Sequence, residues 1–312
     1  MQTTTPYSAR HQLIGYAMAA LAAIGFSAKA IFAKLVYQDA VDAVTILALR
    51  MALSTPFFLV VALHHASQSR LAPLTRKDYA SILLLGLLGY YLSSLFDFIG
   101  LQYISAGLER LILFLYPTFV VVLSAILFGK PFGHRELSAL LLSYAGIAVV
   151  FSDQVHLAGD RLWLGSAFVV ASTLTYSAYL IGVGETIARI GTSRFTAYAM
   201  LVACAASLLQ FALTHSLATL SLSIRVYQLT LAMAIFSTVL PVFMLSAAIH
   251  RIGSGHTSLI GMLGPVATLF LANLFLDEQL SGQQMSGAAL VILGVLSLSL
   301  NASKQASARP NS

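Results

Sequence analysis

The chain has 312 residues, of which 58% are hydrophobic and only 9% are charged. Soluble domains carry about 25% charged residues, so this chain has too few polar side chains to cover a water-facing surface, and its mean hydropathy of +0.86 agrees. The composition excludes a cytosolic enzyme, a nucleic-acid-binding domain and a disordered regulator, and it leaves a polytopic membrane protein. The net charge of +6 reflects loop cations that set orientation rather than an anionic partner.

Ten apolar runs follow one another along the chain, and a membrane-spanning helix needs about 20 such residues. The runs are 13–36, 43–63, 79–103, 106–128, 137–151, 162–183, 195–213, 226–249, 255–276 and 285–300. The fifth and tenth are short, at about 15 residues, and can extend into their flanks. All are predicted to be helices because an open sheet edge cannot satisfy its backbone in lipid. The expected fold is an all-α membrane protein with ten transmembrane helices.

The first run shares features with a signal peptide, since Arg10 precedes it and Ala28-Lys29-Ala30 resembles a small-residue cleavage site. The apolar run nevertheless continues past Lys29 to Val36. We therefore interpret it as a retained transmembrane helix.

Lysine and arginine in the loops predict the orientation, because cytoplasmic loops are enriched in them. With the amino terminus inside, the cytoplasmic segments hold Arg10, Arg70, Arg76, Lys77, Lys130, Arg135, Arg189, Arg194, Arg251, Lys304 and Arg309. The opposite side holds Arg161 and Arg225, with Lys34 at the boundary. Both termini are therefore predicted to be cytoplasmic, as an even number of spans requires.

The two halves of the chain carry an internal repeat. Residues 104–146 align without a gap on 252–294, so that Gly107, Pro117 and Gly146 meet Gly255, Pro265 and Gly294. Earlier in each half, Phe26-Ser27-Ala28-Lys29 resembles Tyr176-Ser177-Ala178-Tyr179. Five spans is an odd number, so the second copy must cross the membrane in the opposite direction. Inverted repeats are common in secondary transporters, whose halves exchange conformations to open each side in turn.

Several short motifs carry a family resemblance: Leu101-Gln102-Tyr103-Ile104-Ser105-Ala106-Gly107, then Pro117, Gly264-Pro265 and Leu274-Phe275-Leu276-Asp277-Glu278. With them the chain resembles the EamA family of the drug/metabolite transporter superfamily. The resemblance implies two inverted five-helix EamA repeats, at 13–151 and 162–300, between cytoplasmic tails at 1–12 and 301–312. It also implies an exporter of amino acids or related metabolites in a bacterial inner membrane. The family often has Gly-Glu after the fourth helix of each half, whereas this chain has Gly129-Lys130 and Asp277-Glu278, a departure that bears on folding.

Ionisable residues inside membrane spans are costly, at about 2.5–3.5 kcal/mol each on insertion scales, and they suggest a cavity. Five occur in the first half: Lys29, Arg50, Asp97, Glu109 and Arg110. At about 1.5 Å per helical residue, all lie within roughly 10 Å of the outer boundary. They can form a network that locks the outer end, an outer gate, or a site for the carboxylate and amine of a zwitterion.

Polar stripes place the predicted substrate or gating site more closely. Tyr90, Ser94 and Asp97 share one helix face through their i, i+4, i+7 spacing, and so do Ser172, Thr175 and Tyr179. The candidates for substrate contact or gating are Lys29, Tyr90, Ser94, Asp97, Thr175 and Tyr179. The alternative for such stripes is close helix packing through small and polar residues.

Prolines inside spans remove a backbone hydrogen bond and bend the helix. Pro117 and Pro265 are equivalent in the repeat. They are predicted either to act as hinges in the fourth helix of each half or to fix a static kink.

We expect a secondary transporter that exports a small solute by alternating access, with amino acids as the leading solute class. The alternative is an exporter of multiple drugs or amphipathic compounds, and proton coupling through Asp97 or Glu109 stays open. No Gly-x-Ser-x-Gly or His-Glu-x-x-His motif occurs, so we expect no enzyme, and neither a cofactor nor a metal site. The expected partners are a small-molecule solute and the lipid bilayer, without nucleic acid, and the chain is expected to be a monomer or a homodimer.

Overall fold

The computed structural model describes residues 9–68, 73–129, 134–158, 161–261 and 263–307. Regular structure in these residues is helical, and no strand occurs among them. The prediction of an all-α fold is therefore confirmed. Parts of the two predicted tails, 1–8 and 308–312, lie outside the described residues.

Every predicted span corresponds to a helix or to helices joined end to end. The first half contains α1 (Ala9–Tyr37), α2 (Ala43–Ala66), α3 (Arg76–Gly86), the π-helical turn η1 (Leu87–Leu92), α4 (Ser93–Leu101), α5 (Ala106–Leu113), α6 (Tyr116–Phe128) and α7 (His134–Ala158). The second half contains α8 (Arg161–Ile190), α9 (Thr192–Thr214), the 3₁₀ turn η2 (Leu217–Leu220), α10 (Ile224–Ala234), the π-helical turn η3 (Ile235–Val239), α11 (Leu240–Gly261), α12 (Leu263–Leu276) and α13 (Gly282–Ser307). Gly253, with φ 80°, separates the eighth span from the ninth inside α11.

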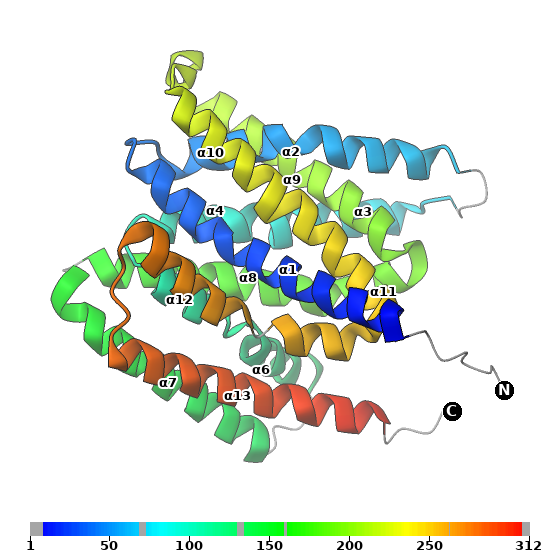
Figure 1. Cartoon of the computed structure of the whole chain (residues 1–312). Helices are drawn as coiled ribbons and strands as arrows, with labels where there is room; N and C mark the ends of the chain where they lie inside the picture. The colour runs from blue at the N-terminus through cyan, green and yellow to red at the C-terminus, as the bar shows by residue number, and fades with distance from the viewer. Residues whose placement is uncertain (1–8, 69–72, 130–133, 159–160, 262, 308–312) are drawn as a thin grey trace.

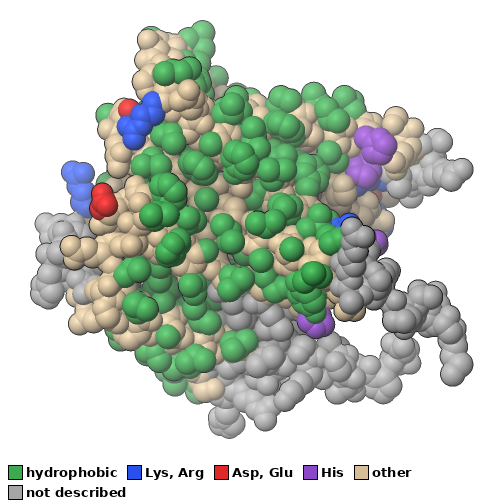
Figure 2. Space-filling model, in the orientation of Figure 1, with side chains coloured by type: hydrophobic (Ala, Val, Ile, Leu, Met, Phe, Trp, Pro, Cys, Tyr) green, Lys and Arg blue, Asp and Glu red, His purple; other side chains and the backbone are tan. Residues whose placement is uncertain are grey.

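Seven continuous helical segments of the described chain are long and apolar enough to cross a membrane, and shorter apolar helices occur at Leu141–Ser152 and Leu263–Leu276. The fifth and tenth spans are longer than their apolar runs, since α7 has 25 residues and α13 has 26. Hydrophobic side chains cover the middle of the face shown in Figure 2, while charged side chains lie near its left and right edges. Exposure of large side chains such as Leu213 (77%) fits a surface that contacts lipid. The chain is a multi-pass membrane protein.

The first helix of each half packs against the third and fourth spans of the other half, and the second helices of the two halves pack against each other. α1 lies against α11 and α12, α8 lies against α4, α5 and α6, and α2 pairs with α9. α7 and α13 run side by side along one edge of the bundle, where Figure 1 shows them at the bottom. We call the end with the α1–α2 turn the Asp42 end and the opposite end, where α3 begins, the Asp78 end.

Close approach of α7 and α13 depends on glycine. A Cβ added to Gly146 would lie 2.6 Å from the Gly287 carbonyl oxygen, and one added to Gly287 would lie 2.4 Å from a Val150 methyl carbon. Small residues allow such backbone contact between membrane helices. The fifth and tenth spans therefore form a lateral pair beside the other helices.

Side chains fix where the helices begin. Asp42 caps α2 by accepting hydrogen bonds from the Val44 and Thr45 amides at 2.8 and 3.1 Å. Thr75 and Asp78 form a reciprocal capping box at the start of α3, and Asp78 also pairs with Arg189. The carboxylate of Glu278, after α12, accepts from the Ala106 amide at 3.0 Å, so this acid at the end of the fourth span of one half caps a helix of the other half.

Candidate functional site

A buried ionic cluster joins three helices near the Asp42 end. Lys29 on α1 forms an ion pair with Asp97 on α4, and its Nζ lies 3.9 Å from Oε1 of Glu109 on α5. The side chains of Lys29, Asp97 and Glu109 are 17%, 2% and 1% exposed. One ammonium therefore serves two buried carboxylates, and Glu109 has no conventional hydrogen-bond donor among the described residues.

The two arginines of the predicted network do not join these ion pairs. Arg50 donates from Nη2 to Ser94 Oγ at 3.0 Å, and its guanidinium carbon lies 5.0 Å from the centre of the Phe98 ring. Arg110 packs on the Gly264 backbone, where an added Cβ would lie 2.5 Å from Nη2. Neither arginine lies within 4.0 Å of a carboxylate in the described part of the chain. The structure thus brings Lys29 to both acids and leaves Arg50 and Arg110 beside them.

The predicted tyrosines meet in the interior of the bundle. The Tyr90 and Tyr179 hydroxyls are 3.0 Å apart, and Tyr179 stacks on Tyr176 with ring centres separated by 5.6 Å. Tyr176 in turn meets Tyr116 edge-on at 5.6 Å. A Cβ on Gly89, in η1, would lie 2.3 Å from Cγ of Tyr179. The rings fill the space between α8 and η1, and neither of the two cavities described below is lined by Tyr90 or Tyr179.

The remaining predicted contact residues are held by their own surroundings. The Thr175 hydroxyl donates to the Ala171 and Ser172 carbonyls of its own helix at 3.0 and 2.9 Å. The Ser172 hydroxyl donates across to the Ser93 carbonyl at 2.7 Å. At this level the sixth span and the third are joined by hydroxyls, which corresponds to the packing alternative for the polar stripe.

Two equivalent serines bind the carbonyl just before each repeated proline. Ser27 donates to the Gly264 carbonyl at 2.9 Å, and Ser177 donates to the Tyr116 carbonyl at 3.1 Å. Each serine also donates to the carbonyl four residues earlier in its own helix. Sequence reasoning aligned both serines and both prolines but missed this pairing. The signal was present in the repeated Ser-Ala step, but no one-dimensional pattern states which helices touch.

The fourth span is interrupted ahead of Pro117. α5 ends at Leu113, α6 begins at Tyr116, and the Leu115 carbonyl accepts from the Thr118 amide and hydroxyl at 2.9 and 2.6 Å. The position equivalent to Phe114 is Met262, which lies outside the described residues.

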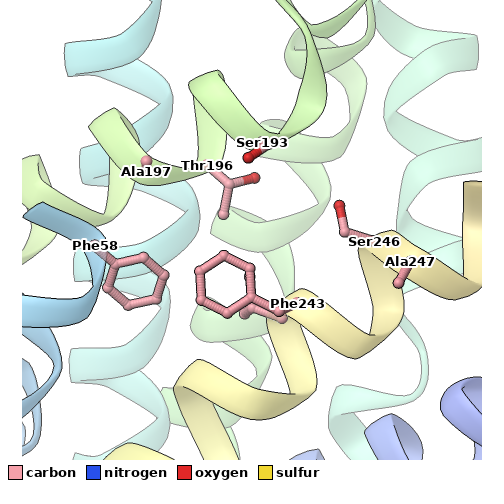
Figure 3. Close-up of a pocket in the computed structure, with 8 residues that line it drawn as sticks. Phe58, Ser193, Thr196, Ala197, Phe243, Ser246 and Ala247 are labelled. Atoms are coloured by element: carbon pink, nitrogen blue, oxygen red, sulfur yellow. The ribbon is translucent and has the colours of Figure 1, made fainter. Parts of the chain in front are cut away.

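Two cavities open at opposite ends. A cavity of about 240 Å³ lies between α2, α9 and α11 near the Asp78 end, and Figure 3 shows its labelled lining. A wider one of about 510 Å³, at the Asp42 end, includes Asp42 and Arg161 in its lining. Burial opposes ionisation of Asp42, but hydrogen bonds from Thr45 and Val44 and the nearby His215 outweigh it and lower the Asp42 pKa. Sequence reasoning predicted neither cavity.

Similar proteins agree with this architecture. The EamA-like transporter family matches residues 13–152 and, again, 163–300. A Bacillus subtilis protein named uncharacterized transporter YcbK is 30% identical over 275 residues, covering 84% of this chain and 85% of the relative. A probable amino-acid metabolite efflux pump of Escherichia coli is 26% identical over 199 residues, covering 61% of this chain and 66% of the relative.

A crystal structure with 19% sequence identity superposes with a TM-score of 0.65, covering 96% of this chain and 99% of that chain. At this identity the likeness shows the fold alone. The family and the named relatives are transporters rather than enzymes. Since the two matches of the family span most of its residues, the chain belongs to the EamA-like transporter family.

Proposed function

We propose that the protein is a secondary exporter of small metabolites, with amino acids as the leading class, and that it works by alternating access. The observation that carries the proposal is the pair of equivalent contacts Ser27–Gly264 and Ser177–Tyr116. Each contact joins the first helix of one half to the pre-proline carbonyl of the other. Two such interfaces, related by the inverted repeat, can exchange roles when the transporter turns from one side to the other.

In this mechanism the ionic cluster closes the Asp42 end. The ion pair between Lys29 and Asp97, with Glu109 beside it, ties α1 to α4 and α5. Opening this end separates the pair, and a zwitterion then offers its carboxylate to Lys29 and its ammonium to Asp97. The solute thus replaces each lost contact by one of the same charge type, which lowers the cost of exposing the buried groups.

The proposal places both termini in the cytoplasm of a bacterial cell, with the protein in the inner membrane. The loop cations support this orientation. In the structure, α1 begins and α13 ends on the same side of the bundle, at the right of Figure 1. The Asp42 end then faces outward and the cavity at the Asp78 end faces the cytoplasm.

Amino acids are favoured by charges of both signs in the ionic cluster and by the name of the Escherichia coli relative. The second candidate is an exporter of amphipathic compounds. It is favoured by the stacked tyrosines Tyr90, Tyr176 and Tyr179, because aromatic hydroxyls combine an apolar face with a hydrogen-bonding group.

Efflux from proteoliposomes tests the function. Vesicles containing the purified protein are loaded with a mixture of labelled amino acids, and efflux is followed with and without a pH gradient. The proposal expects selective efflux that is lost in Lys29→Met and retained in Trp163→Phe, a control at a 68% exposed position. Absence of amino-acid efflux, together with efflux of amphipathic compounds, would favour the second candidate.

A further inference from the structure

The cavity at the Asp78 end has two chemically different walls. Its apolar side is formed by Phe58, Val242 and Phe243, and its polar side carries the hydroxyls of Ser193, Thr196 and Ser246. Figure 3 shows the two phenylalanine rings together on one side and the labelled hydroxyl side chains across from them. Its described lining contains no Lys, Arg, Asp or Glu.

The apolar wall can hold a compact hydrocarbon group. The ring centres of Phe58 and Phe243 are 6.1 Å apart at an interplanar angle of 30°. The volume of about 240 Å³ corresponds to about eight water molecules at their share of the liquid, about 30 Å³ each. Burying an apolar side chain against the two phenylalanine rings is favourable, whereas a charged side chain packed on them would lose its hydration without gaining a hydrogen bond.

The hydroxyl wall is available for a ligand. Hydroxyls elsewhere in the spans, such as those of Ser54 and Ser207, donate to the carbonyl four residues earlier. Ser246 has no hydrogen-bond partner among the described residues, so its hydroxyl is free to bind a solute. Ser193 Oγ lies 2.9 Å from Nε2 of His65, which holds it at the cavity edge.

Helix α9 connects this cavity to the tyrosine cluster. Thr196 lines the cavity, and the residue before it, Phe195, stacks on Tyr179 with ring centres 6.3 Å apart. Tyr90 is in turn bonded to Tyr179 on the other half. A solute that reaches the Thr196 hydroxyl therefore contacts the helix whose Phe195 packs on the tyrosines at the interface between the halves.

We propose that this cavity is the loading site for amino acids with uncharged, apolar side chains of about the size of leucine. The side chain packs on Phe58 and Phe243, and the amino and carboxylate groups bind the hydroxyls of Ser246, Thr196 and Ser193. The inference rests on the proposed export of amino acids and names the members of that class. It assigns the first contact to a site distinct from the ionic cluster at the Asp42 end.

Binding of tritiated L-leucine to the purified full-length protein in nanodiscs tests the assignment, with L-lysine and L-glutamate as competitors. Ala247 lines the cavity, so Ala247→Phe should fill it and weaken leucine binding about tenfold or more. Ile249→Phe enlarges a 39% exposed side chain on the same helix and should bind like the parent. Ser246→Ala, which removes the hydroxyl and adds no atom to the cavity, should weaken binding several-fold, and thermal unfolding confirms that each variant is folded.

Equal leucine binding by the parent and Ala247→Phe would overturn the proposal, as would equally strong competition by L-glutamate. The efflux assay separates this failure from that of the proposed function. Amino-acid efflux from vesicles, with leucine binding insensitive to Ala247→Phe, would contradict the loading site and leave the proposed transport function standing. Saturable leucine binding that Ala247→Phe abolishes, without efflux of any amino acid, would contradict the transport function and leave the binding site standing.

Discussion

Lys29 neutralises the buried carboxylates of the ionic cluster, because it is the one described cation within salt-bridge distance of Asp97 and Glu109. Removing one partner of a buried ion pair leaves an uncompensated charge and costs more than the pair itself contributes. Arg50 is held differently, by the Ser94 hydroxyl and the Phe98 ring. Neutralising Lys29, Asp97 or Glu109 one at a time should therefore lower the free energy of unfolding by different amounts.

Lys29→Met should destabilise the protein more than Asp97→Asn does. The first change leaves two buried carboxylates without a cation, at a cost of about 3–5 kcal/mol. The second leaves Lys29 with Glu109, 3.9 Å away, as a remaining partner. Thermal unfolding in detergent measures the difference, and equal losses in the two variants would show that Glu109 does not compensate.

Asp42 should make stability depend on acid. Its lowered pKa means that the ionised form is favoured by folding, so the stabilisation is present above the ordinary value of 3.8 and is lost as pH falls through the lower pKa of the folded state. Asp42→Asn retains a helix-capping side chain and should make stability less dependent on pH in this acid range. It should cost about 0.3–1 kcal/mol at pH 7, through the lost negative charge at the start of α2. Unfolding temperatures of the parent and of Asp42→Asn, measured across this pH range, test the prediction. An equal loss of stability in acid in both proteins would contradict the assignment to Asp42.

At the scale of elements, the two halves share irregularities as well as helices. The π-helical turns η1 and η3 begin at Leu87 and Ile235, which are as far apart in sequence as Pro117 and Pro265. Such turns interrupt regular hydrogen bonding and are frequent at functional sites. η1 places Gly89 against Tyr179, and η3 places the Phe236 carbonyl against Gly25. The third span of each half thus receives the first helix of the other at a matching irregular turn.

The two serine contacts at the prolines should stabilise opposite conformations of the transporter. Each hydrogen bond is worth about 1 kcal/mol, which is about a fivefold change in a conformational population. Ser27→Ala and Ser177→Ala should each slow efflux by about that factor, because each biases the exchange toward one side. The double variant restores the balance and should be less impaired than the product of the two single effects. Multiplicative losses in proteoliposome efflux would contradict coupled exchange between the halves.

The pair formed by α7 and α13 should not tolerate a larger residue at its contact. A Cβ at position 287 would lie 2.5 Å from the Gly146 carbonyl oxygen, so Gly287→Ala should destabilise the protein by about 1–3 kcal/mol. Gly184 in α8 has nothing within 4 Å of an added Cβ. Gly184→Ala should therefore be neutral or stabilising by about 0.5–1 kcal/mol, and thermal unfolding compares the two. Equal effects would show that the helices do not meet through Gly287.

How far the sequence predicts this structure depends on which forces act locally. Spans follow from hydropathy because a lipid-crossing helix must be apolar along its length, and the inversion follows from an odd number of spans per half. The lengths of α7 and α13 were underestimated because their polar ends carry no hydropathy signal. Which cation meets Asp97 depends on helix tilt and side-chain reach, so Lys29 could not be separated from Arg50. The π-helical turns and the cavity near Phe243 arise only from packing between distant helices.

For the whole molecule, the structure combines an ionic cluster at the Asp42 end, whose residues do not line the cavity of about 510 Å³ there, with a cavity between the halves' helices at the Asp78 end. The ionic cluster ties α1, α4 and α5 at the first, while α2, α9 and α11 leave about 240 Å³ at the second. Because the halves are related by an inverted repeat, the opposite state requires no new type of contact, only an exchange between equivalent interfaces. Access at the two ends should therefore be coupled in opposite directions.

Thiol labelling tests this coupling most directly. The one cysteine, Cys204, is buried and is removed as Cys204→Ser, and a single reporter is placed by Ser94→Cys in the polar layer of the Asp42 end or by Ala247→Cys in the cavity. Each reporter is labelled with a membrane-impermeant reagent, with and without Asp97→Asn, which weakens closure of the Asp42 end. Alternating access predicts that Asp97→Asn increases labelling of Ser94→Cys and decreases labelling of Ala247→Cys. Labelling that rises at both ends, or changes at one end alone, would contradict alternating access.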